Sequence, residues 1–177
     1  MGTGKTTLGF HLARALSMTF VDLDGLIEHE AGRSVSEIFS TLGEERFRAL
    51  EREAVKNVVS GEQDRGIVLA TGGGTVVDHD SRALLKQWGL IICLTADIAT
   101  ILERTGKAHR GYRGGGGRGH EKRPLLDTGD REAEIKRLLL EREPAYRDCD
   151  MSLDTSVDST GDLIKKIKAF VDGVQES

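Results

Sequence analysis

The first residues of the chain carry a pattern suited to binding phosphate. Residues 2–7 read G-T-G-K-T-T and run straight into an amphipathic segment, which matches the last part of the phosphate-binding loop pattern G-x-x-x-x-G-K-[ST]. Glycines let backbone N–H groups turn toward an anion, and the N-terminus of the following helix adds the positive end of its dipole. We therefore expect Lys5 to reach the β- and γ-phosphates of a nucleotide and the Thr6 hydroxyl to ligate Mg²⁺.

The loop pattern departs from its full form at the start of the chain. A further glycine and a buried strand normally precede it, and neither is found before residue 2. Because that strand is central in folds of this kind, its absence is expected to leave two unpaired edges inside the sheet. We favour a start assigned too late, or a truncated chain, over a true variant.

Two carboxylates, Asp22 and Asp24, follow an expected strand at residues 19–21. The carboxyl end of a strand is where ligands bind in parallel sheets. One carboxylate could hold Mg²⁺ through water, and the other could accept or orient the proton of a substrate hydroxyl. The alternative for Asp24 is a helix N-cap.

Gly72, Gly73 and Gly74 follow the expected strand at residues 67–70. Three glycines can bring backbone N–H groups against a ligand, or simply form a tight turn. Arg48 and Glu51 are three residues apart on an expected helix. They form either a surface ion pair or a fork that Glu51 holds in place for a substrate carboxylate.

Arg142 falls within the apolar stripe set by Ile135, Leu138 and Leu139, where a solvated arginine is not expected. Either its stem reaches outward to solvent or its guanidinium turns toward an anion in the site. Pro144 is expected to disrupt the helix just beyond it.

A basic, glycine-rich stretch interrupts the regular pattern. Residues 104–123 contain seven Lys or Arg and one acidic residue, with four successive glycines at 114–117. So many glycines do not hold one backbone conformation, which predicts a mobile loop. It is either a flexible basic surface loop or a lid that closes over an anionic substrate.

The elements that must position these residues alternate between strand and helix. Expected strands lie at residues 19–21, 67–70, 90–94 and 151–153, and expected helices at 5–17, 44–59, 132–142 and 163–171. The strands at 67–70 and 90–94 are continuously apolar, as strands buried on both faces should be. Ser34 with Glu37 forms a capping box, and Thr128 or Asp130 could cap the helix that follows. This alternation predicts an α/β fold with a mostly parallel sheet.

Composition fits one soluble domain. The chain has 177 residues and a formal net charge of −4, which argues against a general nucleic-acid or anionic-membrane binder. Cys93 and Cys149 have no metal-ligand spacing and read as free thiols of a reducing compartment. The longest apolar run, residues 90–94, is too short to span a bilayer, and no secretory signal is visible. We expect a cytoplasmic protein without a membrane partner.

The sequence excludes two classes of phosphoryl-transfer protein, the GTPases and the protein kinases. The single asparagine, Asn57, lies in an expected helix, so the guanine-reading motif of GTPases is not present. No protein-kinase signature appears either. A phosphate loop on a short chain with a basic lid instead indicates a small-molecule kinase.

Together the motifs resemble the shikimate kinases, members of the nucleoside monophosphate kinase-like P-loop fold, over nearly the whole chain. The matching segments are M-G-T-G-K-T-T at 1–7, D-L-D at 22–24, G-R-S-V-S-E-I-F at 32–39, G-E-x-x-F-R-x-x-E at 43–51, T-G-G-G at 71–74, R-P-L-L at 123–126 and E-R-x-P-x-Y at 141–146. The resemblance implies a three-layer α/β P-loop fold in a single domain, residues 1–177. It also implies a helical substrate-binding segment near residues 24–60 and a mobile lid near 105–127.

The resemblance further implies that ATP donates its γ-phosphate to the 3-hydroxyl of shikimate, giving shikimate 3-phosphate and ADP on the way to chorismate and the aromatic amino acids. The catalytic residues would be Lys5, Asp24 and Arg123. ATP would be bound by Gly2, Thr3, Gly4, Lys5, Thr6, Thr7, Arg104, Arg123, Thr155 and Ser156. Shikimate would be bound by Asp24, Arg48, Glu51, Gly72, Gly73, Gly74 and Arg142. Mg²⁺ would be held by Thr6 and, through water, Asp22. We expect a monomer whose partners are shikimate and ATP.

Three other interpretations remain open at this point. A gluconate-type sugar-acid kinase shares the loop and also binds a polyhydroxy carboxylate. A non-catalytic module could hold a nucleotide or a cyclohexene acid without turning it over. A nucleic-acid role for the basic loop is disfavoured, because Tyr112 is its one aromatic residue.

Overall fold

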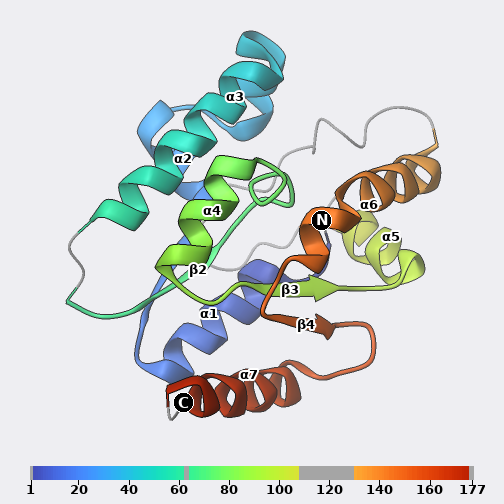
Figure 1. Cartoon of the computed structure of the whole chain (residues 1–177). Coiled ribbons are helices and arrows are strands. Elements are labelled where there is room, and N and C mark those ends of the chain that lie inside the picture. The colour runs from blue at the N-terminus through green and yellow to red at the C-terminus, as the bar shows by residue number, and fades with distance from the viewer. Residues whose placement is uncertain (1, 62–63, 108–129, 176–177) are drawn as a thin grey trace.

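The structure is a computed structural model that describes residues 2–61, 64–107 and 130–175 (Figure 1). In chain order its elements are α1 (Lys5–Leu16), β1 (Thr19–Asp22), α2 (Leu23–Ala31), α3 (Val35–Ser60), β2 (Ile67–Ala70), α4 (His79–Trp88), β3 (Ile92–Thr95), α5 (Ile98–Lys107), α6 (Arg131–Arg147), β4 (Met151–Asp154) and α7 (Thr160–Gln175). Residues 105–107 of the predicted lid are the end of α5. The rest of the lid, with Arg123, lies outside the described residues, and so does Thr128, the alternative cap.

The four strands form two parallel pairs. β1 pairs with β2 from Thr19↔Ile67 to Asp22↔Ala70, and β3 pairs with β4 from Ile92↔Met151 to Thr95↔Asp154. The predicted parallel arrangement is therefore confirmed, with strand ends shifted by one or two residues. No ladder joins β2 to β3 within the described part of the chain.

Burial of the strands is lower than their apolar sequences predict. Most residues of β2 and β3 are half-buried, and Leu90 lies before β3 and is exposed. The prediction of strands buried on both faces is wrong because, among the described residues, each sheet has two strands and both of its edges are unpaired, which leaves the side chains partly accessible.

Helix α1 packs against both pairs of strands. Its Leu8 and Leu12 are buried in a cluster with Leu153 of β4 and with Leu163 and Ile167 of α7. The half-buried side chains packed against this cluster come from both sides: Val68 of β2, Ile92 and Leu94 of β3, and Met151 of β4. Side-chain packing on α1 thus connects the two pairs.

A second core lies under α2, α3 and α4, which are grouped together in Figure 1. Its largest fully buried side chains are Leu23, Ile27 and Ile38. The predicted capping box begins α3: the Ser34 hydroxyl accepts from the Glu37 N–H, and Glu37 accepts from the Ser34 N–H. Gly43 then breaks the helix with φ 80° and ψ 169°, so the predicted helix at 44–59 is the second half of α3.

Helix α6 contradicts one prediction. It continues through Pro144 to Arg147 instead of ending before the proline. Pro144 and Leu140, four residues earlier, both lie on the exposed face, where water can replace the hydrogen bond that proline removes. The helix begins at the predicted cap Asp130, whose carboxylate accepts from the N–H groups of Glu132 and Ala133.

Helical periodicity did not predict three helices, α2, α4 and α5, although α2 lies in the helical segment that the resemblance implied. Each is nine or ten residues long. No helix in the described ranges is both long and apolar enough to cross a membrane.

Candidate active site

The phosphate-loop segment turns directly into α1. Gly2 and Gly4 have φ values of 68° and 82°, a region that favours glycine, and α1 begins at Lys5. Lys5 is half-buried, Thr3 is buried, and Thr6 and Thr7 are exposed on the first turn. The described part of the loop therefore has the local geometry that the sequence predicts for an anion site at a helix N-terminus.

The carboxylate of Asp22 lies against this helix start. The Thr6 hydroxyl donates a hydrogen bond to Asp22 Oδ2 at 2.8 Å, and Asp22 Oδ1 accepts from the Gly25 N–H at 3.3 Å. Asp22 is thus the N-cap of α2, and the alternative that Asp24 is the cap is wrong. Asp24 instead lies in the first turn of α2. The Thr6 and Asp22 oxygens stand side by side, and hard oxygen ligands of this kind suit Mg²⁺.

The turn after β2 is where the predicted substrate residues meet. A Cβ at Gly72 would lie 2.9 Å from Glu51 Oε1 and 3.6 Å from Asp24 Oδ1. A Cβ at Gly74 would overlap the Arg48 guanidinium. The backbone is held as a turn, because the Thr75 N–H donates to the Gly72 carbonyl at 3.2 Å. Glycine is required here because the side chains of α2 and α3 approach the backbone closely.

Arg48 is held by carboxylates on two sides. Its Nη1 donates to Glu51 Oε2 at 2.7 Å, while Nε and Nη2 donate to Glu44 Oε1 at 3.3 and 3.0 Å. Burial lowers the pKa of the Arg48 guanidinium, but the hydrogen bonds and charges of Glu51 and Glu44 outweigh it, so that its pKa lies above its ordinary value. The interpretation of Arg48 and Glu51 as a simple surface ion pair is wrong, because the Glu51 side chain is 3% exposed.

The second carboxylate oxygen of Glu51 has its own donor. The Thr75 hydroxyl donates to Glu51 Oε1 at 2.5 Å, and Thr75 is 1% exposed. A buried carboxylate needs both a countercharge and hydrogen bonds, and Arg48 with Thr75 supplies them. Glu51 therefore positions Arg48.

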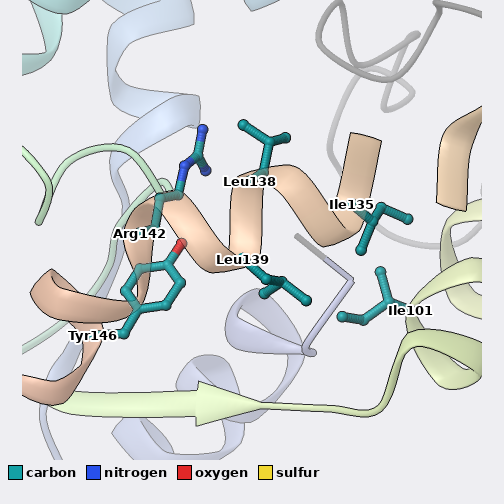
Figure 2. Close-up of a pocket in the computed structure, with 6 residues that line it drawn as sticks. All are labelled: Ile101, Ile135, Leu138, Leu139, Arg142 and Tyr146. Carbon is teal, nitrogen blue, oxygen red and sulfur yellow. The ribbon is translucent and has the colours of Figure 1, made fainter. Parts of the chain in front are cut away.

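Arg142 enters the site from α6. It is 8% exposed, and a Cβ at Gly73 would lie 3.0 Å from its Nη1, so the alternative that its head reaches solvent is wrong. Figure 2 shows its guanidinium pointing away from Leu139 and Ile101 below it. These side chains belong to a small, mostly apolar pocket lined by Ile101, Ile135, Leu138, Leu139, Arg142 and Tyr146.

Tyr146 lies one turn after Arg142 on the same face of α6 (Figure 2). Its hydroxyl donates to the Gly73 carbonyl at 2.9 Å. Burial raises the pKa of the Tyr146 phenol, and Arg142 only partly offsets this, so the group stays protonated and remains a donor. Tyr146 thereby ties α6 to the glycine turn beside Arg142.

The predicted adenine-side residues also come together. Arg104 of α5 donates to the Thr155 hydroxyl at 2.8 Å and to the Thr155 carbonyl at 2.7 Å, and its Nη1 lies 3.4 Å from the Gly2 carbonyl. The Ser156 hydroxyl accepts from the Asp97 N–H at 2.7 Å. These contacts connect the phosphate loop, α5 and the segment after β4.

Sequence reasoning assigned no role to Thr75, Tyr146 or Glu44. Each carried a signal in its spacing. Thr75 directly follows the three glycines, Tyr146 is four residues after Arg142, and Glu44 is four residues before Arg48. Residues four apart share one face of a helix, so both helical partners could have been placed beside their arginines.

The arrangement offers two sets of groups that suit ligands. On one side, Arg48, Arg142 and the glycine turn offer donors to a carboxylate, with Asp24 near enough to Gly72 to reach hydroxyl groups on the same molecule. On the other side, the phosphate loop, Arg104 and Thr155 offer a nucleotide site. Phosphoryl transfer to a small hydroxylated carboxylic acid is the chemistry that such a pair of sites supports.

Comparisons with known proteins agree with this chemistry. The family model described as shikimate kinase matches residues 1–172. A shikimate kinase from Geobacter sulfurreducens is 42% identical over 97% of this chain and 86% of its own length. One from Francisella tularensis subsp. holarctica is 37% identical over 97% of this chain and 90% of its own.

Solved structures give the same result. The shikimate kinase from Acinetobacter baumannii in complex with shikimate superposes with a TM-score of 0.85 at 32% identity, over all of this chain and 91% of that one. The shikimate kinase from Aquifex aeolicus gives a TM-score of 0.75 at 27% identity, over all of this chain and 94% of that one.

Proposed function

Because the chain belongs to the shikimate kinase family, we propose that it transfers the γ-phosphoryl group of ATP to the 3-hydroxyl of shikimate, releasing shikimate 3-phosphate and ADP. The observation that carries the proposal is the glycine turn at residues 72–74. It gathers Asp24 and Glu51 of α2 and α3 at Gly72, Arg142 at Gly73 and Arg48 at Gly74. Two arginines and one reachable carboxylate match a ring that carries one carboxylate and several hydroxyls.

Arg48 and Arg142 bind the shikimate carboxylate in this proposal. Glu51 fixes Arg48, and Thr75 fixes Glu51, so the arginine has little freedom to lose when the acid binds. The backbone at Gly73 and Gly74 lies close enough to these guanidiniums to complete the carboxylate site. The result is an acid held in one orientation, with its 3-hydroxyl directed toward the phosphate loop.

Asp24 orients the 3-hydroxyl and accepts its proton as the oxygen attacks the γ-phosphorus, and the bond from that phosphorus to the β-γ bridging oxygen breaks to release ADP. Lys5 and the N–H groups at the start of α1 bind the β- and γ-phosphates and stabilise the negative charge that spreads over the transferring group. Arg123, by the resemblance, approaches the same group from the lid.

Thr6 and Asp22 would hold Mg²⁺, since their hydroxyl and carboxylate oxygens are 2.8 Å apart at the end of the phosphate loop. A magnesium ion there would neutralise phosphate charge on ATP. Arg104, Thr155 and Ser156 would border the adenine. A monomeric, cytoplasmic enzyme remains our prediction from the family.

ADP release from Mg·ATP, with and without shikimate, tests the proposal on the chain as printed, with folding checked by circular dichroism. We expect shikimate-dependent release, and ³¹P NMR of the product should show a phosphate monoester on the 3-oxygen. R142A should abolish turnover, whereas R137A on the exposed face of the same helix should retain it. Gluconate-dependent release, or shikimate binding without release by the folded chain, would overturn the proposal in favour of the sugar-acid kinase or the binding module.

A further inference from the structure

The Glu44 carboxylate accepts hydrogen bonds from the edge of the Arg48 guanidinium that is best suited to bind a substrate carboxylate. The Arg48 guanidinium has two carboxylate-binding edges, and Glu51 takes one of them through Nη1. The Nε and Nη2 groups both donate to a single oxygen of Glu44, at 3.3 and 3.0 Å. The Nε–Nη2 edge is the one on which a carboxylate docks side-on with two parallel hydrogen bonds.

The two glutamates are held very differently. The Glu51 side chain is 3% exposed and has a second donor in Thr75. The Glu44 side chain is 53% exposed, and the hydrogen bonds recorded for its carboxylate in the described ranges both go to Arg48. If a substrate carboxylate displaces Glu44 from Arg48, no buried charge is left unpaired. Displacement of Glu51 would leave its buried carboxylate without a countercharge.

The place of Glu44 in the helix also allows its side chain to leave Arg48. Gly43 has φ 80° and ψ 169°, a combination open essentially to glycine, and it divides α3 into two helical halves. Glu44 is the first residue after this break, at the exposed N-terminal end of the second half of α3. A change of its side-chain rotamer can therefore move its carboxylate into solvent without moving Arg48 or Glu51.

We propose that Glu44 is an internal competitor for the substrate carboxylate, occupying the Nε–Nη2 edge of Arg48 in the free enzyme and giving it up when the acid binds. The proposal rests on the function proposed above, because it takes the acid to bind at Arg48. Glu44 then makes binding at Arg48 more selective, because only an anion with a carboxylate that can form two parallel hydrogen bonds to Nε and Nη2 displaces it. The product keeps the same carboxylate, so Glu44 also assists product release.

The test compares E44Q with E45Q, which removes the same charge from the next residue, an exposed glutamate. Steady-state kinetics should show the KM for shikimate lowered about two- to fivefold in E44Q, the factor expected when an exposed ion pair no longer competes. The inhibition constant of shikimate 3-phosphate should fall by the same factor. The KM for ATP should not change, and E45Q should match the parent in every constant.

The outcomes separate this proposal from the proposed function. A higher KM for shikimate in E44Q would show that Glu44 supports Arg48 in the bound state, and an unchanged KM would show that it does not compete; either result overturns the inference while leaving shikimate turnover intact. An equal decrease in E45Q would assign the effect to general charge and would overturn it too. If the parent enzyme turns over no shikimate, the proposed function fails first, and isothermal titration of shikimate into both variants then decides whether any acid competes with Glu44.

Discussion

The Tyr146 hydroxyl donates a hydrogen bond to the Gly73 carbonyl across 2.9 Å, joining two segments that are 73 residues apart in the chain. Through this bond α6 fixes the glycine turn at the point where Arg142 approaches it. The proposed carboxylate site therefore uses α6, the glycine turn and Arg48 of α3, and this hydrogen bond fixes the first two relative to each other.

Removal of this hydroxyl in Y146F should raise the KM for shikimate by about five- to tenfold, since one neutral hydrogen bond contributes roughly 1 kcal/mol. We expect kcat to change much less, because the phenol bonds to the glycine turn and not to the phosphate loop. Steady-state kinetics with shikimate varied at saturating ATP gives the split. A lower kcat at unchanged KM would contradict a positioning role for Tyr146.

Substitution of Thr75 by valine keeps the shape of the side chain but leaves a buried carboxylate oxygen of Glu51 without its donor. The free energy of unfolding should fall by about 2 kcal/mol, the usual contribution of a hydrogen bond to a charged group. Urea denaturation measures it, and T75S, which keeps the hydroxyl, is the matched control. Equal stability of T75V and the parent would mean that water satisfies Glu51.

Asp22 is the N-cap of α2 and, in our proposal, holds Mg²⁺ through water, and D22N separates these two roles. Asparagine still caps α2 and still accepts a hydrogen bond from Thr6, but it lacks the negative charge. We expect the concentration of Mg²⁺ needed for half-maximal activity to rise by about ten- to a hundredfold, with little loss of stability. The control is D78N, which changes the N-cap of α4 in the same way. The same Mg²⁺ requirement in D22N and D78N would remove Asp22 from the metal site.

The capping box of α3 gives a pH dependence of stability. The Ser34 backbone N–H, and after it the Ser34 hydroxyl, lowers the pKa of Glu37 below its ordinary value of 4.5. A carboxyl group whose pKa is lower in the folded state stabilises the fold above the unfolded value and loses that contribution as the pH falls through the folded value. Stability should therefore decline as the pH drops below 4.5.

E37Q tests the source of that decline, because glutamine can still accept from the Ser34 N–H but does not titrate. Urea midpoints measured between pH 6 and pH 3 should fall less steeply in E37Q than in the parent. Parallel profiles for the two proteins would assign the acid sensitivity to other carboxylates.

The sequence predicted the parts of the site whose chemistry is local. The phosphate loop is a short motif at the start of α1, whereas the two carboxylates and the glycine turn are short motifs at the ends of β1 and β2, so their places followed from the order of the elements. Arg142 was also found locally, because a charge in an apolar stripe conflicts with helical periodicity.

What the sequence did not predict depends on contacts between distant segments. The bonds from Tyr146 to Gly73 and from Thr75 to Glu51 join residues 73 and 24 positions apart. Helix α2 was missed because nine residues directly after a strand offer little periodicity to read. The prediction that Pro144 disrupts α6 failed because it depends on which face of the helix is exposed, and that exposure is a property of the packed protein.

The division of the strands into two pairs has a consequence for the accuracy of catalysis. Asp22 and the glycine turn belong to the β1–β2 pair, whereas Thr155 follows the β3–β4 pair, and the buried leucines of α1 contact both pairs. A hydrogen bond between two elements sets their separation through its own length and direction. Packed leucine side chains set the separation through the volume that they fill. The separation between phosphoryl donor and acceptor therefore depends on aliphatic packing as well as on polar links such as that from Thr6 to Asp22. A change of one methylene group under α1 can thus misalign the two substrates while every polar residue of the site keeps its identity.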